Sequence, residues 1–213
     1  IELDPQGVEA SIAATGFGFC LAAHFHPAFR YTGPSRREIG VPTVFNLLGP
    51  MANPAPISNM LVGVAMPNMM EAMVGSLTSR HVTSAWVVHG HGGLDELAVS
   101  GPNIVYELRD GNISRFEIDA ADFGISHSLL ADIRGGDATD NLVIMNDLFA
   151  GKAGAVRDIV TFNAGCALFV ANHVGSVADG IDVARTTIDS GAAASILVKV
   201  VAVSSAEAER MQV

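Results

Sequence analysis

The sequence predicts an α/β protein whose central sheet is mixed and largely parallel, is flanked by helices, and is followed by a helical C-terminal third. Short apolar runs alternate with helix-like segments in the middle of the chain, and a turn signal joins two further strands there. Alanine and glycine are plentiful, and aromatic residues make up only 6% of the chain. This composition favours helices packed closely on a sheet over an aromatic-rich β-sandwich.

The composition also limits the class of protein. Hydrophobic residues make up 49% of the 213 positions and charged residues 16%, which is enough apolar sequence for a sizeable core. We found no linker or repeat, so we expect one domain over residues 1–213. The net charge of −10 argues against a general nucleic-acid or membrane-binding surface, although it does not argue against a local basic pocket. Cys20 and Cys166 are too few for a disulfide framework, which predicts a reducing, cytoplasmic location.

The first helix begins at Asp4-Pro5, since Asp caps a helix and Pro suits its first position. Val8 and Ile12 are expected to form its apolar stripe, with Ala13 beside them, and Gly16 ends it.

The segment after this helix is the first candidate site. Residues 17–21 are expected to form a buried strand, and residues 39–48 are apolar enough to pack before a Gly- and Pro-rich loop. Between them lies a polar segment that contains His24, His26, Arg30, Arg36 and Arg37. Arginine presents a planar fork of donors that matches carboxylate and phosphate groups. The segment is therefore either an anion site or a solvated basic helix face.

The middle of the chain carries the sheet. Strands are expected at residues 60–65, 85–89, 104–108 and 113–118, and a helix at residues 67–79 whose methionines fill the core. The last two strands should form a hairpin around Asp110-Gly111-Asn112, because these residues tolerate tight-turn geometry.

The last third is expected to contain four helices, over residues 138–150, 155–172, 176–189 and 191–203, of which the second is central and buried. Gly135-Gly136-Asp137 before the first of them could be a phosphate loop. We favour a helix cap, because the charge of Asp137 would repel an anion there.

Two adjacent carboxylates, Asp95 and Glu96, follow the strand at residues 85–89 and a run of glycines. Glycines let backbone approach a ligand closely, and adjacent hard oxygen donors suit Mg²⁺ that is shared with substrate phosphates. The alternative is a tight loop followed by a solvated acidic pair.

With these motifs in order, the chain resembles the C-terminal, larger part of the anthranilate phosphoribosyltransferase family. The similarity runs through His26-Pro27-Ala28-Phe29-Arg30, Arg36-Arg37-Glu38-Ile39-Gly40, Phe45-Asn46-Leu47-Leu48-Gly49-Pro50, Gly93-Leu94-Asp95-Glu96-Leu97, Gly135-Gly136-Asp137, Arg157-Asp158, Asn163-Ala164 and Asp189-Ser190-Gly191. The ordered set is specific, although each motif alone is weak.

The resemblance implies transfer of a phosphoribosyl group from phosphoribosyl pyrophosphate to anthranilate, with Mg²⁺ held by Asp95 and Glu96. It implies that Arg36 binds the anthranilate carboxylate and that the anthranilate tunnel is lined by Ala22, Ala23, His26, Phe29, Arg30 and Gly49. It assigns no further catalytic residue, and it implies a homodimer for the full-length protein.

The same resemblance implies that the chain is a piece of a longer protein. The family's N-terminal helical domain and its main phosphate-binding loop should precede Ile1, so we expect this piece alone to fold but to be inactive. Two alternative functions fit the sequence less well. A pyrimidine nucleoside phosphorylase would have no use for a carboxylate site at Arg36, and a non-catalytic nucleic-acid-binding relative fits poorly with the net charge of −10.

Overall fold

A computed structural model describes residues 2–27, 38, 49 and 51–212. Its contacts divide the chain into two compact units. One unit comprises Ile1–Pro56 with Ala192–Val213, and the other comprises Ile57–Gly191. The expectation of a single domain stays a prediction, and each unit is described by itself.

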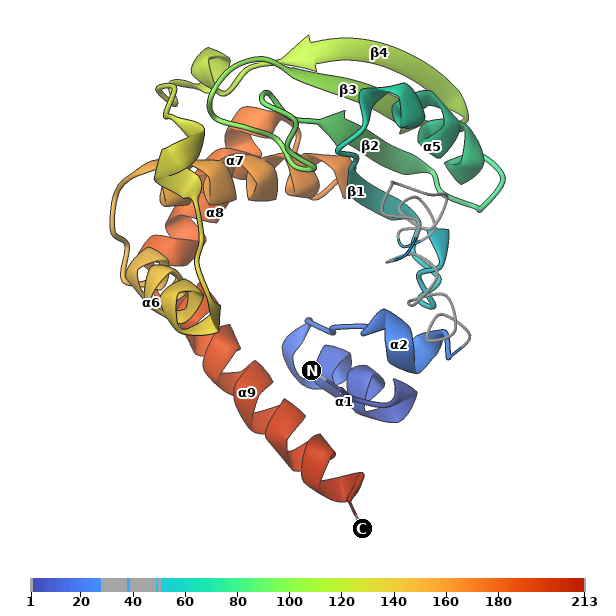
Figure 1. Cartoon of the computed structure of the whole chain (residues 1–213), viewed down its shortest axis with the longest axis vertical. Helices are drawn as coiled ribbons and strands as arrows, with labels where there is room; N and C mark the ends of the chain where they lie inside the picture. Colours follow the sequence, from blue (N-terminus) through green and yellow to red (C-terminus); the bar gives the residue numbers. More distant parts are fainter. Residues whose placement is uncertain (1, 28–37, 39–48, 50, 213) are drawn as a thin grey trace. The chain divides into compact units, whose positions relative to one another are not determined.

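The larger unit contains a mixed sheet with the strand order β1-β2-β3-β4 (Figure 1). The strands are β1 (Asn59–Gly63), β2 (Ser84–His89), β3 (Asn103–Arg109) and β4 (Asn112–Ile118). A mixed sheet is therefore confirmed, but "largely parallel" is wrong for the described strands. Only β1 and β2 run parallel, whereas β2–β3 and β3–β4 are antiparallel. The reason is that neither the loop between β2 and β3 nor the turn between β3 and β4 contains a crossover helix, so each returns the chain in the opposite direction.

The predicted hairpin between β3 and β4 is confirmed. Asp110 and Gly111 have φ angles of 49° and 82°, and Arg109 pairs with Asn112 across them. Positive φ at both central residues is the requirement of a two-residue turn that matches the twist of the strands.

Helices cover both faces of the sheet (Figure 1). After a short helix, η1 (Pro67–Met69), helix α5 (Met70–Leu77) packs against β2 and β3. Met70 and Met73 are fully buried, which confirms that these methionines fill the core. On the other face, Trp86 and Val88 belong to a core cluster with residues of α7 (Ala155–Val170).

Helix α7 is the central helix of this unit, as predicted. It packs tightly against α8 (Val177–Asp189), since a Cβ at Gly180 would lie 2.3 Å from the carbonyl oxygen of Gly165. Cys166 of α7 is fully buried in the core cluster, and this burial raises the pKa of its thiol to about 12.

Three shorter helices follow the sheet: η2 (Ala120–Phe123), η3 (Leu130–Ile133) and α6 (Ala138–Phe149). The carboxylate of Asp137 accepts hydrogen bonds from the N–H groups of Thr139 and Asp140 at 2.8 and 3.0 Å. The capping role of Asp137 is thus confirmed.

The smaller unit contains α1 (Pro5–Thr15), α2 (Ala22–Phe25) and α9 (Ala192–Arg210). The predicted ends of α1 are confirmed: the carboxylate of Asp4 accepts the N–H of Gly7 at 2.8 Å, and Gly16 adopts a left-handed conformation. Asp4 also binds Arg210 of α9 at 2.7 Å. Helix α9 extends beyond the predicted end at residue 203.

Two predictions for the smaller unit are wrong. Residues 17–21 form no strand, and the side chains of Phe17 and Phe19 are 51% and 48% exposed. No strand of this unit's described residues is available to pair with them, and an unpaired extended segment is not a strand. Ile12 lies on the exposed side of α1, while Val8 is buried as expected. The prediction for residues 39–48 lies outside the described residues.

Among the described helices, none alone is long and apolar enough to cross a membrane; α8 and α9 meet that criterion only when taken together.

Candidate functional site

The acidic pair follows β2 through a tight turn. The N–H of Gly90 donates to the carbonyl of Leu94 at 2.8 Å, and the N–H of Gly93 donates to the carbonyl of Gly90 at 3.0 Å. Gly92 and Gly93 have φ angles of 78° and 90°, which L side chains rarely adopt. The predicted glycine-rich turn therefore reverses the chain and returns Asp95 to the end of the sheet.

Two more glycines let the backbone of the acidic pair lie directly on the strand ends. A Cβ at Gly63, the last residue of β1, would lie 1.5 Å from the carbonyl oxygen of Asp95. A Cβ at Gly90 would lie 2.1 Å from the carbonyl oxygen of Glu96. No larger residue fits at either position without movement of the loop. Glycine at positions 63 and 90 therefore allows the backbone of Asp95 and Glu96 to lie in direct contact with the strand ends.

The carboxylates themselves face solvent. Asp95 and Glu96 are both exposed, and within the part of the chain that the structure describes neither side chain forms a hydrogen bond or ion pair with protein. The pKa of Glu96 is raised above its usual value, first by partial desolvation and second by the negative charge of Asp95. A positive ion between the two groups would relieve this repulsion.

The donor set fits Mg²⁺. Magnesium is commonly bound through one or two carboxylates together with waters and substrate phosphates, and not by an all-protein cage. The described residues contain no group of three or more His, Cys, Asp or Glu side chains that could hold a metal alone. Asp95 and Glu96 would therefore hold the ion jointly with a phosphorylated substrate.

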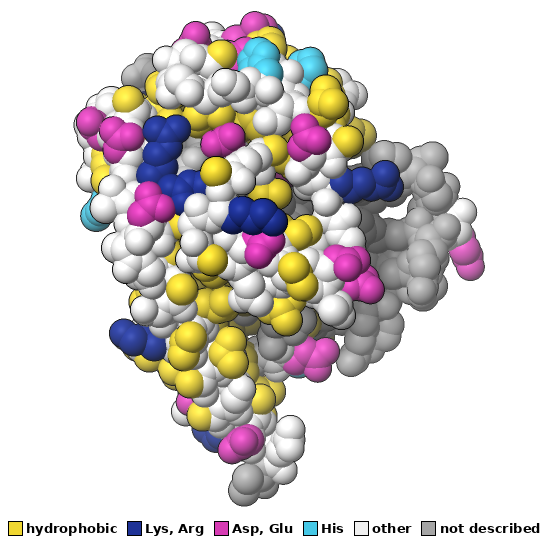
Figure 2. Space-filling view, turned by 90° about the vertical axis from the view of Figure 1, so that its left-hand side faces the viewer, with side chains coloured by type: hydrophobic (Ala, Val, Ile, Leu, Met, Phe, Trp, Pro, Cys, Tyr) yellow, Lys and Arg dark blue, Asp and Glu magenta, His cyan; other side chains and the backbone are white. Residues whose placement is uncertain are grey.

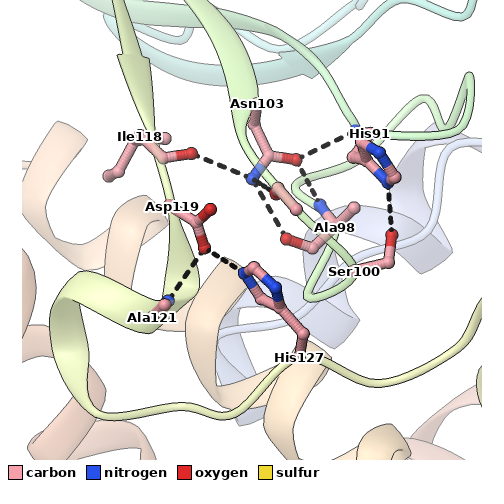
Figure 3. A network of polar contacts seen from close by, with 9 residues as sticks. His91, Ala98, Ser100, Asn103, Ile118, Asp119, Ala121 and His127 are labelled. Carbon is pink, nitrogen blue, oxygen red and sulfur yellow. Dashed lines mark hydrogen bonds and ion pairs between the residues drawn. The ribbon is translucent and has the colours of Figure 1, made fainter.

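A buried asparagine organises the loop from the sheet side (Figure 3). The side-chain oxygen of Asn103 accepts the N–H groups of Ala98 and His91 at 2.6 and 3.3 Å. Its amide nitrogen donates to the carbonyls of Ala98, Gly101 and Ile118 at 3.0 to 3.2 Å. Asn103 has no exposed surface, so it links the start and the end of the loop inside the core.

Next to this network, Asp119 binds His127 at 2.7 Å and the N–H of Ala121 at 2.9 Å (Figure 3). Burial by itself would raise the pKa of Asp119, but the bonds from Ala121 and His127 outweigh it and lower the pKa below its usual value. No sequence pattern indicated either Asn103 or Asp119, because their partners are backbone groups and a histidine that lies eight residues after Asp119.

The predicted anthranilate residues are only partly described. Ala22, His26 and Gly49 line one small pocket of about 100 Å³ in the smaller unit. His26 Nε2 lies 2.5 Å from the carbonyl oxygen of Ala52, which belongs to the same wall. Ala23 lies in α2. The predictions for Phe29, Arg30 and Arg36 fall outside the described residues.

A larger pocket, of about 230 Å³, lies between α6 and the start of α7. Its charged groups already have partners: Lys152 binds Asp147 and Arg157 binds Asp189, each at 2.7 Å, and Asp132 accepts the N–H of Leu129 at 3.0 Å. No predicted site residue lines it. We therefore place the candidate site at the Asp95–Glu96 loop and not at this pocket.

Comparison with known proteins identifies the family of the chain. Residues 1–194 match the glycosyl transferase family, a/b domain. The chain belongs to this family. Among relatives of known name, the anthranilate phosphoribosyltransferases of Roseiflexus castenholzii and Afipia carboxidovorans are each 42% identical, over 207 and 206 residues. These alignments cover 96% and 97% of this chain and 61% of each relative.

Solved structures of the family show the same fold. The crystal structure of anthranilate phosphoribosyltransferase from Thermus thermophilus has a TM-score of 0.87 and 35% identity, and the match covers 95% of this chain and 60% of that one. The Saccharomyces cerevisiae enzyme in complex with PRPP and Mg has a TM-score of 0.88 at 22% identity, covering 96% and 59%. The chain thus spans about 60% of the length of the relatives it matches.

Proposed function

We propose that the chain forms the α/β part of an anthranilate phosphoribosyltransferase of tryptophan biosynthesis. The enzyme transfers the 5-phosphoribosyl group of phosphoribosyl pyrophosphate (PRPP) to the amino nitrogen of anthranilate and releases pyrophosphate. The observation that carries this proposal is the acidic pair: two adjacent carboxylates without protein partners among the described residues, held by backbone contacts at the ends of β1 and β2. The 42% identity to enzymes of this name supports it.

The proposed chemistry needs positioning more than a nucleophilic side chain. The anthranilate nitrogen forms a bond to C1 of the ribose, the bond from C1 to pyrophosphate breaks, and the amine releases a proton. The attacking nitrogen is already nucleophilic, so no covalent enzyme intermediate is required. Asp95 and Glu96 would hold Mg²⁺, which offsets the negative charge on the leaving pyrophosphate when bound. Because the backbone of Asp95 and Glu96 is fixed, their two carboxylates are in position before the reaction begins.

Anthranilate recognition is assigned to the segment that resembles the family's tunnel. Ala22, His26 and Gly49 line the small pocket of the smaller unit. We assign Ala23, Phe29 and Arg30 to the same tunnel. We assign Arg36 to the anthranilate carboxylate, because arginine can bind a carboxylate through two parallel hydrogen bonds beside the apolar walls that a benzene ring requires. A cytoplasmic homodimer is part of the same proposal.

A nucleic-acid-binding function has less support. Figure 2 shows one face of the molecule, on which the Lys and Arg side chains of the described residues are few and interspersed with acidic ones. The net charge of −10 points the same way.

The chain spans about 60% of its relatives, so we assign the main phosphate-binding loop to the part of those enzymes that this chain does not match. The 213 residues alone should then fold without catalysing the reaction. Turnover by the purified chain, free of host enzyme, would contradict this assignment.

The decisive test replaces Asp95 by Asn and Glu96 by Gln in the complete enzyme. Turnover should fall by orders of magnitude at limiting Mg²⁺ and recover partly as Mg²⁺ rises, since a weakened site can still be filled by mass action. The free energy of unfolding should change by less than about 0.5 kcal/mol, because both side chains are exposed. Asp182→Asn, at another exposed position, is the control. An unaltered Mg²⁺ response would rule out the metal assignment.

A second test concerns anthranilate. Arg36→Ala should raise the anthranilate KM by an amount that corresponds to about 2–3 kcal/mol, the worth of a hydrogen bond between charged groups. Arg37→Ala should do less. If Arg37→Ala has the greater effect, the alignment of this segment with the family is shifted by one residue.

A further inference from the structure

The residue that follows the acidic pair is held by a side chain from a distant helix. The N–H of Leu97 donates to Oδ1 of Asn163 at 2.9 Å, and Nδ2 of Asn163 donates to the carbonyl of Leu97 at 2.7 Å. Asn163 lies on α7, 66 residues further along the chain. An asparagine amide is suited to this two-way contact because it offers a donor and an acceptor side by side.

The position of Asn163 is itself well fixed. Its Nδ2 also donates to the carbonyl of Ile159, one turn earlier in α7, at 2.9 Å. The neighbouring Phe162 is fully buried in the same core cluster as Leu97. The amide therefore projects from a rigid helix at the level of the loop, and its alternative rotamers would leave both polar groups of Leu97 unpaired.

This contact acts on the acidic pair through the backbone. The N–H of Leu97 belongs to the same peptide plane as the carbonyl of Glu96, and that carbonyl lies against Gly90. With Asp95 pressed onto Gly63, the pair is fixed by strand ends on one side and by Asn163 on the other. Rotation of the peptide plane between residues 96 and 97 would move the Glu96 carboxylate relative to that of Asp95.

We propose that Asn163 is a positioning residue for the Asp95–Glu96 carboxylates and sets the geometry in which they hold a divalent cation. The inference rests on the proposed function, in which this pair binds Mg²⁺. Asn163 contacts neither metal nor substrate, and it acts only through Leu97.

The test uses a matched pair of asparagines in the complete enzyme. Asn141 makes the same two-way contact with backbone, since it accepts the N–H of Gly136 at 3.0 Å and donates to the carbonyl of Gly136 at 3.1 Å. This second contact lies on the exposed loop before α6 and involves no residue of the acidic pair. Asn163→Ala and Asn141→Ala therefore remove the same chemistry at two places.

Binding of Mn²⁺ is measured by electron paramagnetic resonance with PRPP present, alongside the Mg²⁺ dependence of turnover and the melting temperature. Asn163→Ala should weaken Mn²⁺ binding about 10-fold or more, the range seen when a residue that orients metal ligands is removed. Its Mg²⁺ requirement should rise by the same factor, with the anthranilate KM unchanged at saturating Mg²⁺. Asn141→Ala should match the wild type in both metal measurements.

Asn163→Leu has nearly the same size as asparagine and removes both the donor and the acceptor without adding charge, so it provides a second variant if Asn163→Ala does not fold. Wild-type Mn²⁺ affinity in a folded Asn163 variant would overturn the inference while the proposed function stands. A wild-type enzyme that binds no Mn²⁺ and makes no product would instead overturn the proposed function, and the inference with it.

Discussion

Two loops of this protein, at residues 90–98 and 135–137, contain similar residues but lie in different surroundings. Each contains a Gly-Gly pair and an acidic residue, and each has a backbone residue held by an asparagine amide: Leu97 by Asn163, and Gly136 by Asn141. The loop at residues 90–98 rests on strand ends and on the buried Asn103, whereas the loop at residues 135–137 is exposed.

The difference decides what the carboxylates can do. The carboxylate of Asp137 is already bonded to the N–H groups of Thr139 and Asp140, and it serves as a helix cap. In the other loop the backbone is held by glycine contacts and asparagines, so Asp95 and Glu96 have no protein hydrogen bond within the described ranges. A ligand can use acidic groups only where the fold does not need them.

The largest effect is expected from Asn103→Ala, which breaks the buried support of the first loop. The change leaves the N–H of Ala98 and the carbonyls of Gly101 and Ile118 without this partner inside the core. Each unpaired buried group costs about 1–3 kcal/mol, so the free energy of unfolding should fall by about 3–5 kcal/mol in urea titrations. Asn141→Ala should cost less than about 1 kcal/mol, because water can replace its exposed bonds. Equal losses would show that burial does not separate the two loops.

Asp137→Ala probes the exposed loop and should have a smaller effect. Loss of an N-cap costs about 1 kcal/mol, so the free energy of unfolding should fall by about that amount. Thermal unfolding of the variant and the wild type measures the difference. The Mg²⁺ dependence of turnover in the complete enzyme should stay unchanged. A shift in Mg²⁺ dependence would restore the phosphate-loop interpretation of Gly135-Gly136-Asp137.

The smallest effect is expected from Asp119→Asn, next to the Asn103 network, and it should depend on pH. Because the pKa of Asp119 is lowered in the folded state, the hydrogen bonds that its carboxylate accepts from Ala121 and His127 stabilise the protein above the unfolded pKa of about 4. This contribution is lost as the pH falls through the lower, folded pKa. Asp119→Asn should therefore be less stable than wild type near neutral pH, and the two unfolding free energies should converge in acid. Asp122→Asn, in the short helix η2 that Asp119 caps, controls for the loss of one negative charge.

Local chemistry made the two turns and the caps predictable. Asp110-Gly111 specifies its hairpin within four residues, and Asp4 and Asp137 each begin a helix with their own side chains. Features that depend on distant partners were not predictable. Phe17 and Phe19 alternate like a strand, yet in the described part of their unit they have no strand to join.

The candidate site divides in the same way. Asp95 and Glu96 were predicted because a buried run, glycines and carboxylates are adjacent in sequence. Asn163 was noted only as part of the family motif Asn163-Ala164 and was given no role, since its partner lies 66 residues away. Resemblance to the family supplied Arg36 and the tunnel residues, and for these the residues alone indicated only an anion site or a solvated face.

Because Cys166 is buried, the rate at which alkylating reagents modify it reports how often the core of the larger unit opens. The reactive form of cysteine is the thiolate, and a thiol with a pKa of about 12 inside the core is protonated and shielded. Alkylation at this position therefore proceeds only as fast as the packing between α7, α8 and the sheet opens. Cys20 is only half-buried, so its alkylation provides a reference for a thiol that reagents reach without such opening. Mass spectrometry of the two cysteine peptides after timed labelling would measure how much more slowly Cys166 reacts.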